Sequence, residues 1–254
     1  MEIDGTTWVV TGASAGIGEA ITHEARRRGV TVIGVARREG VEVRADLADP
    51  EVVEGLVERI EEEHGPIDVW VNNAGVDARG PFLDASADDV RAIQQINLAT
   101  PIELCRQVIP RMVRRNGGHV VNVSSMASVA AFPGIVLYGS TKAGLSAFHR
   151  VLRTELGRSP VGLTIVEIGP SPTDMLDRAY AHPPTEHGFR RLRRLLVLPE
   201  VDRVRVATEV VDAVEAGRAA VRLPRRIAPA AWVVSVPQRL VDLLTLDRPD
   251  AAAR

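Results

Sequence analysis

A short apolar run, a glycine-rich turn and a helical stretch follow one another at the start of the chain. Thr6–Val10 (TTWVV) reads as a buried strand, and Ile17–Arg28 reads as a helix that ends at Gly29. Between them lies Thr11–Gly18 (TGASAGIG), a turn with more glycines than an ordinary strand-to-helix turn needs. Glycine permits tight turns and a close approach of the backbone to a ligand. The stretch therefore predicts a βα unit whose turn faces a ligand.

The free N–H groups at the start of a helix favour anions, so a glycine turn there can hold a phosphate. Gly12 permits the tight turn, while Gly16 and Gly18 would let the backbone approach a pyrophosphate. The strand, turn and helix together are the context that a dinucleotide-binding motif requires. We expect Gly12, Ser14, Gly16, Ile17 and Gly18 to contact the cofactor.

Strands and helices alternate through the rest of the chain, and parallel strands joined by helices cross over with one hand. We predict a single domain over residues 1–254 of the α/β class, a doubly wound, Rossmann-like parallel sheet of about seven strands with helices on both faces. The expected strands are Thr6–Val10, Val30–Val35, Val41–Arg44, Ile67–Val71, His119–Val123, Val161–Ile168 and Ala219–Leu223. The expected helices are Ile17–Arg28, Pro50–Glu63, Ser86–Arg115, Tyr138–Leu156 and Asp202–Ala216. The apolar residues expected to face the core are Val53, Leu56, Val57 and Ile60 in the second helix and Leu145, Phe148, Val151 and Leu152 in the fourth.

Two of these helices carry further signals. Ser86 begins a capping box, SADD, at the start of the third helix. Asn97 and Pro101 are unfavourable inside that helix. Either they mark a kink whose freed carbonyl faces a water-lined site, or they separate two helices.

The end of the second strand bears on the choice of cofactor. An acidic residue at this place binds the ribose diol of NAD, whereas a basic one accommodates the 2′-phosphate of NADP. Ala36 and Arg37 stand there, which favours NADP(H) over NAD(H), although Arg37 could be a plain surface arginine. The link to the third strand is too short for a full helix, and Asp46 and Leu47 could lie beside the adenine.

The fourth strand runs into Asn72-Asn73-Ala74-Gly75. These residues could tie the strand end to its neighbours and leave room for a cofactor ribose, with Asn73, Ala74 and Gly75 as contacts. A plain turn is the competing interpretation, because Asn and Gly are turn residues.

Tyr138 and Lys142 form the most informative pair in the chain. Residues four apart share one face of a helix, so the phenol and the ammonium can point into the same space. A nearby cation lowers a phenol's pKa from its usual value of about 10, which makes the group a usable acid or base. Lys142 is the only lysine among 31 Lys and Arg residues, and Tyr138 is one of two tyrosines. A chance pair on a solvated helix is therefore the weaker interpretation.

Composition excludes several other classes. The 254 residues carry a formal net charge of −2, so nothing indicates a nucleic-acid partner. The sequence contains no metal-ligand spacing, no signal peptide and no long apolar run, and we expect a cytoplasmic protein. The lone Cys105 fits a reducing compartment and a place in a helix core.

Taken together, TGASAGIG, the NNAG of Asn72–Gly75, Asn97, Ser125 and the Tyr138–Lys142 pair resemble the short-chain dehydrogenase/reductase family over about Thr6 to Thr173. The resemblance implies that Tyr138 is the acid/base and that Ser125 binds the substrate oxygen. It also implies that Lys142 holds the nicotinamide ribose and that Asn97 supports a water in a proton relay. Thr173 would contact the carboxamide. Where the family has Pro-Gly after the sixth strand, this chain has Ile168-Gly169.

The resemblance predicts a carbonyl reductase or alcohol dehydrogenase that uses NADP(H) and acts on a hydrophobic small molecule, as a homodimer or homotetramer. The alternative is a non-catalytic NADP-binding regulator. Residues 174–200 are expected to form a substrate lid, with Met175 and Tyr180 as candidate contacts beside Met126. Residues 225–254 are expected to form a helical extension that caps the core, joins subunits, admits a lipophilic substrate or touches a membrane surface.

Overall fold

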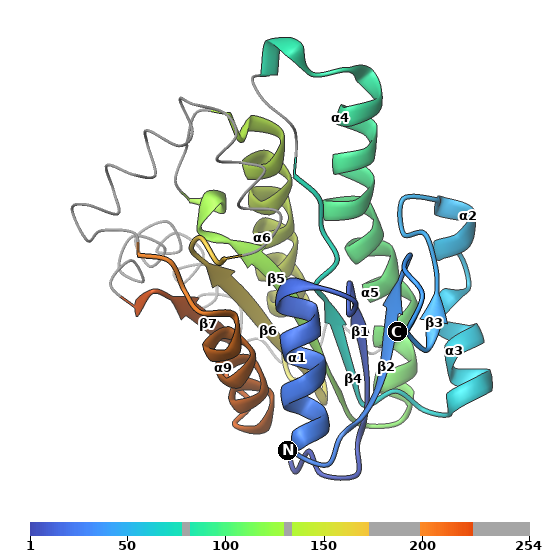
Figure 1. Cartoon of the computed structure of the whole chain (residues 1–254). Helices are drawn as coiled ribbons and strands as arrows, with labels where there is room; N and C mark the ends of the chain where they lie inside the picture. Colours follow the sequence, from blue (N-terminus) through green and yellow to red (C-terminus); the bar gives the residue numbers. More distant parts are fainter. Residues whose placement is uncertain (78–81, 130–133, 173–198, 226–254) are drawn as a thin grey trace.

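All strands of the sheet run parallel, in the order β3-β2-β1-β4-β5-β6-β7. This computed structural model describes residues 1–77, 82–129, 134–172 and 199–225. The strand order reverses between β1 and β4, as in a doubly wound fold, so the predicted fold class is confirmed (Figure 1). The strands are β1 (Thr7–Thr11), β2 (Thr31–Ala36), β3 (Val43–Arg44), β4 (Val69–Asn72), β5 (Gly118–Ser125), β6 (Val161–Ile168) and β7 (Ala220–Leu223).

Helices cover both faces of the sheet. The helices α1 (Gly16–Arg27) and α9 (Arg203–Glu215) lie side by side on one face (Figure 1). Their buried side chains, such as Ile21 and Val210, share one apolar core with Val10 and Val166 of the sheet. The opposite core takes in α2 (Pro50–Val53), α3 (Leu56–His64), α5 (Thr100–Arg114) and α6 (Val136–Leu156).

Two expectations about these helices were wrong. Pro50–Glu63 is not one helix, because Gly55 adopts a left-handed conformation with φ of 66° and separates α2 from α3. The predicted inner residues of this stretch are nevertheless buried, since each short helix turns its apolar side to the sheet. On α6, Leu145 is buried as expected, but Val151 is 58% exposed. Cys105 is buried in α5, as predicted.

The predicted break near Asn97 is a π-helical turn, Gln95–Ala99, between α4 (Ala87–Gln94) and α5. Such turns insert an extra residue into a helix and are frequent at functional sites. The capping box at the start of α4 is present: Ser86 accepts a hydrogen bond from the Asp89 amide at 3.1 Å, and Asp89 accepts one from the Ser86 amide. The π-helical turn therefore lies within one continuous helical segment, which runs from the capped start of α4 to the end of α5.

The crossover from β2 to β3 contains no helix, as its length predicted. Glu42, which lies in this crossover, contacts both β2 and α1. Its carboxylate accepts a hydrogen bond from the Gly34 amide at 2.7 Å and pairs with Arg26 of α1 at 2.5 Å. Burial opposes ionisation of Glu42, but the Gly34 amide and Arg26 outweigh it, so the pKa of this carboxyl is lowered. The truncated crossover is thus tied to α1.

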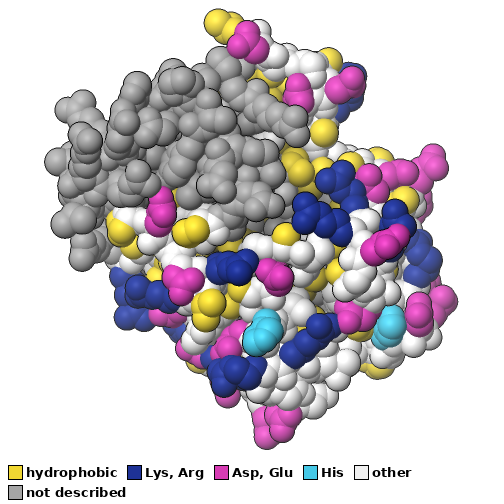
Figure 2. Space-filling view, viewed as in Figure 1, with side chains coloured by type: hydrophobic (Ala, Val, Ile, Leu, Met, Phe, Trp, Pro, Cys, Tyr) yellow, Lys and Arg dark blue, Asp and Glu magenta, His cyan; other side chains and the backbone are white. Residues whose placement is uncertain are grey.

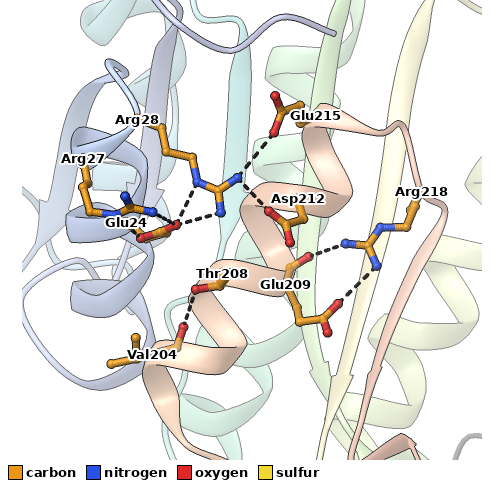
Figure 3. Close-up of polar contacts among 9 residues, drawn as sticks. All are labelled: Glu24, Arg27, Arg28, Val204, Thr208, Glu209, Asp212, Glu215 and Arg218. Atoms are coloured by element: carbon orange, nitrogen blue, oxygen red, sulfur yellow. Dashed lines mark hydrogen bonds and ion pairs between the residues drawn. The ribbon is translucent and has the colours of Figure 1, made fainter.

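Ion pairs join α1 to α9 (Figure 3). Arg28 lies between the helices and contacts Glu24 at 2.7 Å, Asp212 at 2.7 Å and Glu215 at 3.4 Å. Glu24 also accepts a hydrogen bond from Arg27 at 2.8 Å. The bond from Arg27 lowers the pKa of Glu24 to about 2, with Arg28 acting in the same direction against burial. This cluster fixes the relative position of the two helices.

We expect the Glu24→Gln variant to lose about 2 kcal/mol of stability at neutral pH, because Arg27 and Arg28 lose the charged carboxylate to which they donate. The folded-state pKa of Glu24 lies below its ordinary value of 4.5. The contribution of Glu24 is therefore complete above about pH 5 and is lost as pH falls toward 2. Urea unfolding from pH 7 to pH 3 checks this: the difference between native and variant proteins should shrink with falling pH. A constant difference would contradict it.

Candidate active site

A cavity of about 590 Å³ opens at the carboxyl ends of the strands. It is bordered by the ends of β1, β2 and β4, by the start of α1 and by α6. The predicted cofactor residues that line it are Gly12, Ser14, Gly16, Ile17, Arg37, Asp46, Leu47, Asn73, Ala74, Gly75, Tyr138 and Lys142. The sequence motifs therefore converge on one site.

The glycine turn is held against the end of β4 by Thr11. Its hydroxyl donates to the Val71 carbonyl at 3.1 Å and accepts hydrogen bonds from the amides of Asn73 and Ala74 at 2.9 and 3.0 Å. The Asn73 side chain donates to the Thr11 carbonyl at 2.9 Å. Asn73 thus ties the strand ends together, as predicted, and Thr11 is a partner that the sequence analysis did not identify.

The glycines of the turn have two different tasks. Gly12 has φ of 69°, and an added Cβ would lie 2.9 Å from the side-chain nitrogen of Asn73 and 3.0 Å from Cα of Ala74. Gly16 also has a positive φ, of 61°. Gly18 does not line the cavity, and an added Cβ there would collide with the Gly12 carbonyl oxygen. Gly18 thus allows α1 to pack closely against the turn, and its predicted contact with the cofactor stays a prediction.

Two arginines lie at the end of β2. Arg37 and Arg38 both line the cavity, close to Asp46 and Leu47 at the end of β3. The Arg37 carbonyl accepts a hydrogen bond from Arg44 at 3.1 Å, and the Asp46 carboxylate accepts one from the Ala48 amide at 3.0 Å. These contacts shape the two loops that carry Arg37 and Asp46 at the edge of the cavity.

Tyr138 and Lys142 face the same space, as the i,i+4 spacing predicted. The Lys142 ammonium lies 5.8 Å from the centroid of the Tyr138 ring. Lys142 is almost fully buried and donates to the Val123 carbonyl at 2.9 Å. Gly75 lies beside it, since an added Cβ would be 3.6 Å from the ammonium nitrogen, an ordinary contact distance. The fold thus places one buried cation under the phenol.

The protein groups do not lower the phenol's pKa. Burial raises the pKa of Tyr138 to about 12, a hydrogen bond with Ser125 acts against this, and the charge of Asp77 adds to it. Burial lowers the pKa of Lys142 from 10.5 to about 8. In the protein alone, therefore, the phenol's pKa is not lowered as the nearby cation predicted, because burial of Tyr138 is the largest effect on it.

Asn97 and Ser125 adjoin the Tyr138–Lys142 pair without lining the cavity. The Asn97 side chain pairs with the backbone of Val76, accepting from its amide at 2.8 Å and donating to its carbonyl at 2.9 Å. It also donates to the Thr141 hydroxyl at 3.2 Å. The π-helical turn therefore joins the loop after β4 to α6, close to Lys142.

Several predicted residues cannot be placed. Thr173, Met175 and Tyr180 lie outside the described residues, as do most of the expected lid and of the C-terminal extension. Met126 is buried and does not line the cavity, so it is no pocket contact here. Conversely, the cavity includes charged or polar residues that the sequence analysis missed: Arg38, Ser124 and Arg203.

The residues present fit a dinucleotide. The turn presents Gly12 and Gly16, both with a positive φ, and the cavity extends from two arginines at the end of β2 to the Tyr138–Lys142 pair. Between these ends lies the start of α1, where helix amide groups favour phosphate. The structure thus defines the class of protein as a dinucleotide-binding α/β protein with a phenol and an ammonium at one end of its site.

Comparison with known proteins agrees with this class. The family model of the short chain dehydrogenases matches residues 6–183. A short chain dehydrogenase of Pseudocercospora fijiensis is 31% identical over 78% of this chain and 71% of its own length. A fatty acyl-CoA reductase of Mycobacterium tuberculosis is 30% identical over 85% of this chain and 81% of its own length. The chain therefore belongs to the short-chain dehydrogenase family of oxidoreductases.

Another relative from Mycobacterium tuberculosis, named "Probable oxidoreductase EphD", is 32% identical over 89% of this chain, which spans only 41% of that protein. Among solved structures, a short-chain dehydrogenase from Streptomyces avermitilis has a TM-score of 0.77 at 27% identity, covering 98% of this chain and 99% of its own. One from Sphingobium yanoikuyae, in complex with NADPH, has a TM-score of 0.77 at 26% identity and covers 98% of each chain. Both similarities extend over nearly the whole length.

Proposed function

We propose that this protein is an NADP(H)-dependent carbonyl reductase or alcohol dehydrogenase with Tyr138 as its acid/base. The observation that carries the proposal is the Tyr138–Lys142 pair in the same cavity as the glycine turn and Arg37. When bound, the cofactor supplies the hydride that reduces a carbonyl carbon, or accepts one from an alcohol.

Residues of the chain would bind the cofactor and transfer the proton. Gly12, Ser14, Gly16 and Ile17 would hold the diphosphate through the turn, and Arg37 would pair with the 2′-phosphate. Tyr138 would give a proton to the carbonyl oxygen, with Ser125 hydrogen-bonded beside it. Lys142 would bind the nicotinamide ribose and offset the negative charge on the phenolate, while Asn97 would position Lys142 through the loop after β4 and support a relay water.

A buried phenol with pKa of about 12 holds its proton firmly at neutral pH. It is therefore ready to donate in the direction of reduction, and it needs stabilisation of the phenolate as the proton leaves. The Lys142 ammonium would supply positive charge for this, since it lies 5.8 Å from the centroid of the Tyr138 ring. The site therefore favours proton donation that accompanies hydride transfer.

The second candidate function is a non-catalytic regulator that binds NADP. It is favoured by one observation, the raised pKa of Tyr138. The convergence of Asn97, Ser125, Tyr138 and Lys142 argues against it, because binding alone does not require an acid beside a buried cation. We therefore retain the enzyme as the better proposal.

The substrate is proposed to be a hydrophobic small molecule, consistent with a relative that reduces fatty acyl-CoA. In this proposal, residues 174–200 form the substrate wall and residues 225–254 extend the domain. We also propose that the protein is cytoplasmic and forms a homodimer or homotetramer. No helix in the described parts of the chain is long and apolar enough to cross a membrane.

The test is NADPH oxidation, followed at 340 nm, with a panel of aliphatic, aromatic and thioester carbonyl compounds, and NADP⁺ reduction with the matching alcohols. The enzyme proposal predicts turnover with at least one lipophilic class. Tight NADPH binding with no turnover across the panel would favour the regulator instead.

The pH dependence gives a separate prediction. Lys142 has a pKa of about 8, so it loses its charge as pH rises through that value. Without the cation the phenolate is less stable, and kcat/KM for NADPH at saturating ketone should fall about tenfold per pH unit above pH 8, since this parameter reports the free enzyme. A profile that stays flat to pH 10 would contradict a role for the charged lysine.

A further inference from the structure

A charged side chain of α9 reaches the cofactor cavity. Arg203, the first residue of α9, lines the cavity together with Gly16 and Ile17 at the start of α1. Its guanidinium lies 3.1 Å from the Glu19 carboxylate, in the first turn of α1. It therefore lies beside the helix N-terminus where the proposed diphosphate would bind.

The start of α9 is firmly positioned. The Val201 amide donates to the Pro170 carbonyl at 2.8 Å, and Asp202 caps the helix by accepting from the Val204 amide at 3.1 Å. Val206 and Val210 are fully buried against the core. Arg203 is therefore held at the rim of the cavity by the backbone, independently of its contact with Glu19.

The pair between Arg203 and Glu19 is not needed to join the two helices. Arg28 already connects them through Glu24, Asp212 and Glu215 (Figure 3). The side chains of Arg203 and Glu19 are about half exposed, at 49% and 55%. Exposed pairs of this kind contribute little to stability. Arg203 can therefore change partner without loosening the fold.

The charges along the cavity indicate why Arg203 would exchange Glu19 for another partner. Among the described residues that line it, Arg37 and Arg38 lie at the end of β2, and the Lys142 ammonium is directed at the Val123 carbonyl. Among the described residues that line the cavity, Arg203 is the cation beside the first turn of α1. Glu19 on that turn places a negative charge near an incoming diphosphate. A guanidinium forms paired, charge-assisted hydrogen bonds with phosphate oxygens as well as with carboxylates, so a bound diphosphate can take the place of Glu19.

We infer that Arg203 is a diphosphate-binding residue that exchanges Glu19 for the cofactor's diphosphate when a dinucleotide binds. This inference rests on the proposed function only in that the cavity takes a nicotinamide dinucleotide. It does not depend on the choice between NADP and NAD, because both carry the same diphosphate.

The test is calorimetric titration of the full chain with NADPH, NADH, ADP-ribose and 2′,5′-ADP, of which only the last lacks the diphosphate. The Arg203→Gln variant should bind the first three about tenfold more weakly, by the same factor, and 2′,5′-ADP unchanged. The Arg205→Gln variant is the matched control, since Arg205 is exposed on the same turn and does not line the cavity. Its affinities should stay as in the native protein.

The Glu19→Gln variant separates a binding role from a structural one. If Arg203 binds diphosphate, removing the Glu19 carboxylate frees it, and the three ligands that carry a diphosphate should bind as tightly as before or a few-fold tighter. If the pair only holds the helices, both Glu19→Gln and Arg203→Gln should weaken binding, and this result would overturn the inference. Unfolding midpoints of both variants should stay within about 2 °C of the native value.

Other outcomes are also decisive. Equal losses in Arg203→Gln and Arg205→Gln would show a general charge effect and overturn the inference, as would a loss for NADPH alone or no loss at all. If the native protein bound none of the dinucleotides, the proposed function would fail and the inference with it. Native binding that Arg203→Gln leaves unchanged would overturn the inference alone.

Discussion

Replacing Tyr138 with Phe should lower kcat by at least about 10³-fold and leave NADPH affinity nearly unchanged. The variant keeps the ring above Lys142 and removes only the hydroxyl that would carry the proton. General acid catalysis accounts for about 10²- to 10⁴-fold in rate, and the Tyr138 hydroxyl is the group to which the proposed mechanism assigns the proton. Stopped-flow turnover and an NADPH titration on the same preparation would measure both effects.

The matched control is Ser140→Ala on the same helix. Ser140 donates to the Leu137 carbonyl at 2.8 Å and does not line the cavity, so its loss should leave turnover within about twofold. Substantial turnover by Tyr138→Phe would remove the phenol from the mechanism. Loss of NADPH binding in that variant would show that the ring serves the cofactor site instead.

The Arg37→Asp substitution should raise the dissociation constant of NADPH about 100-fold and leave that of NADH unchanged or lower. The proposed 2′-phosphate partner is then replaced by a carboxylate, which repels the phosphate and accepts hydrogen bonds from the ribose diol instead. The ratio of the two dissociation constants, measured by fluorescence titration, is the quantity to follow.

Two further variants make this test specific. Arg158→Asp carries the same change of charge at an exposed position away from the cavity, and its ratio should match that of the native protein. Arg38→Gln shows whether the neighbouring arginine shares the phosphate. A native protein that prefers NADH, or an Arg37→Asp variant with an unchanged ratio, would refute the assignment of NADP(H).

Local signals predicted the parts of the fold and site that depend on nearby residues. The strand, glycine turn and helix of residues 6–28 need only neighbouring backbone, and they formed as expected. The Tyr138–Lys142 pair follows from helix geometry alone. Strand alternation also indicated the parallel sheet, because crossovers of this length permit few other arrangements.

Features that depend on distant segments were not visible in the sequence. Arg203 reaches the glycine turn only because β6 and α9 bring it there, more than 180 residues along the chain. Thr11 shows its role only when the end of β4 lies beside it. The phenol's pKa was misjudged for the same reason, since burial is a property of the packed structure.

Two other wrong predictions, about helix bounds and helix burial, have causes in the local sequence. Gly55 lies in an amphipathic stretch, and its left-handed conformation divides what periodicity alone joins into one helix. Val151 was assigned to the core because it is apolar, although the helix turns it to solvent.

On the face seen in Figure 2, acidic and basic side chains are interspersed, in keeping with the near-neutral net charge and the absence of a nucleic-acid signal.

Direct hydride transfer beside Tyr138 is best tested by following the label from NADPH carrying deuterium at both C4 positions. The native protein and a reducible ketone from the panel are allowed one turnover, and the product alcohol is examined by mass spectrometry and NMR. We expect one deuterium on the carbinol carbon and ordinary hydrogen from water on the oxygen. A product without deuterium on carbon, or with label lost to water, would contradict a reductase that passes hydride from the cofactor to a carbonyl.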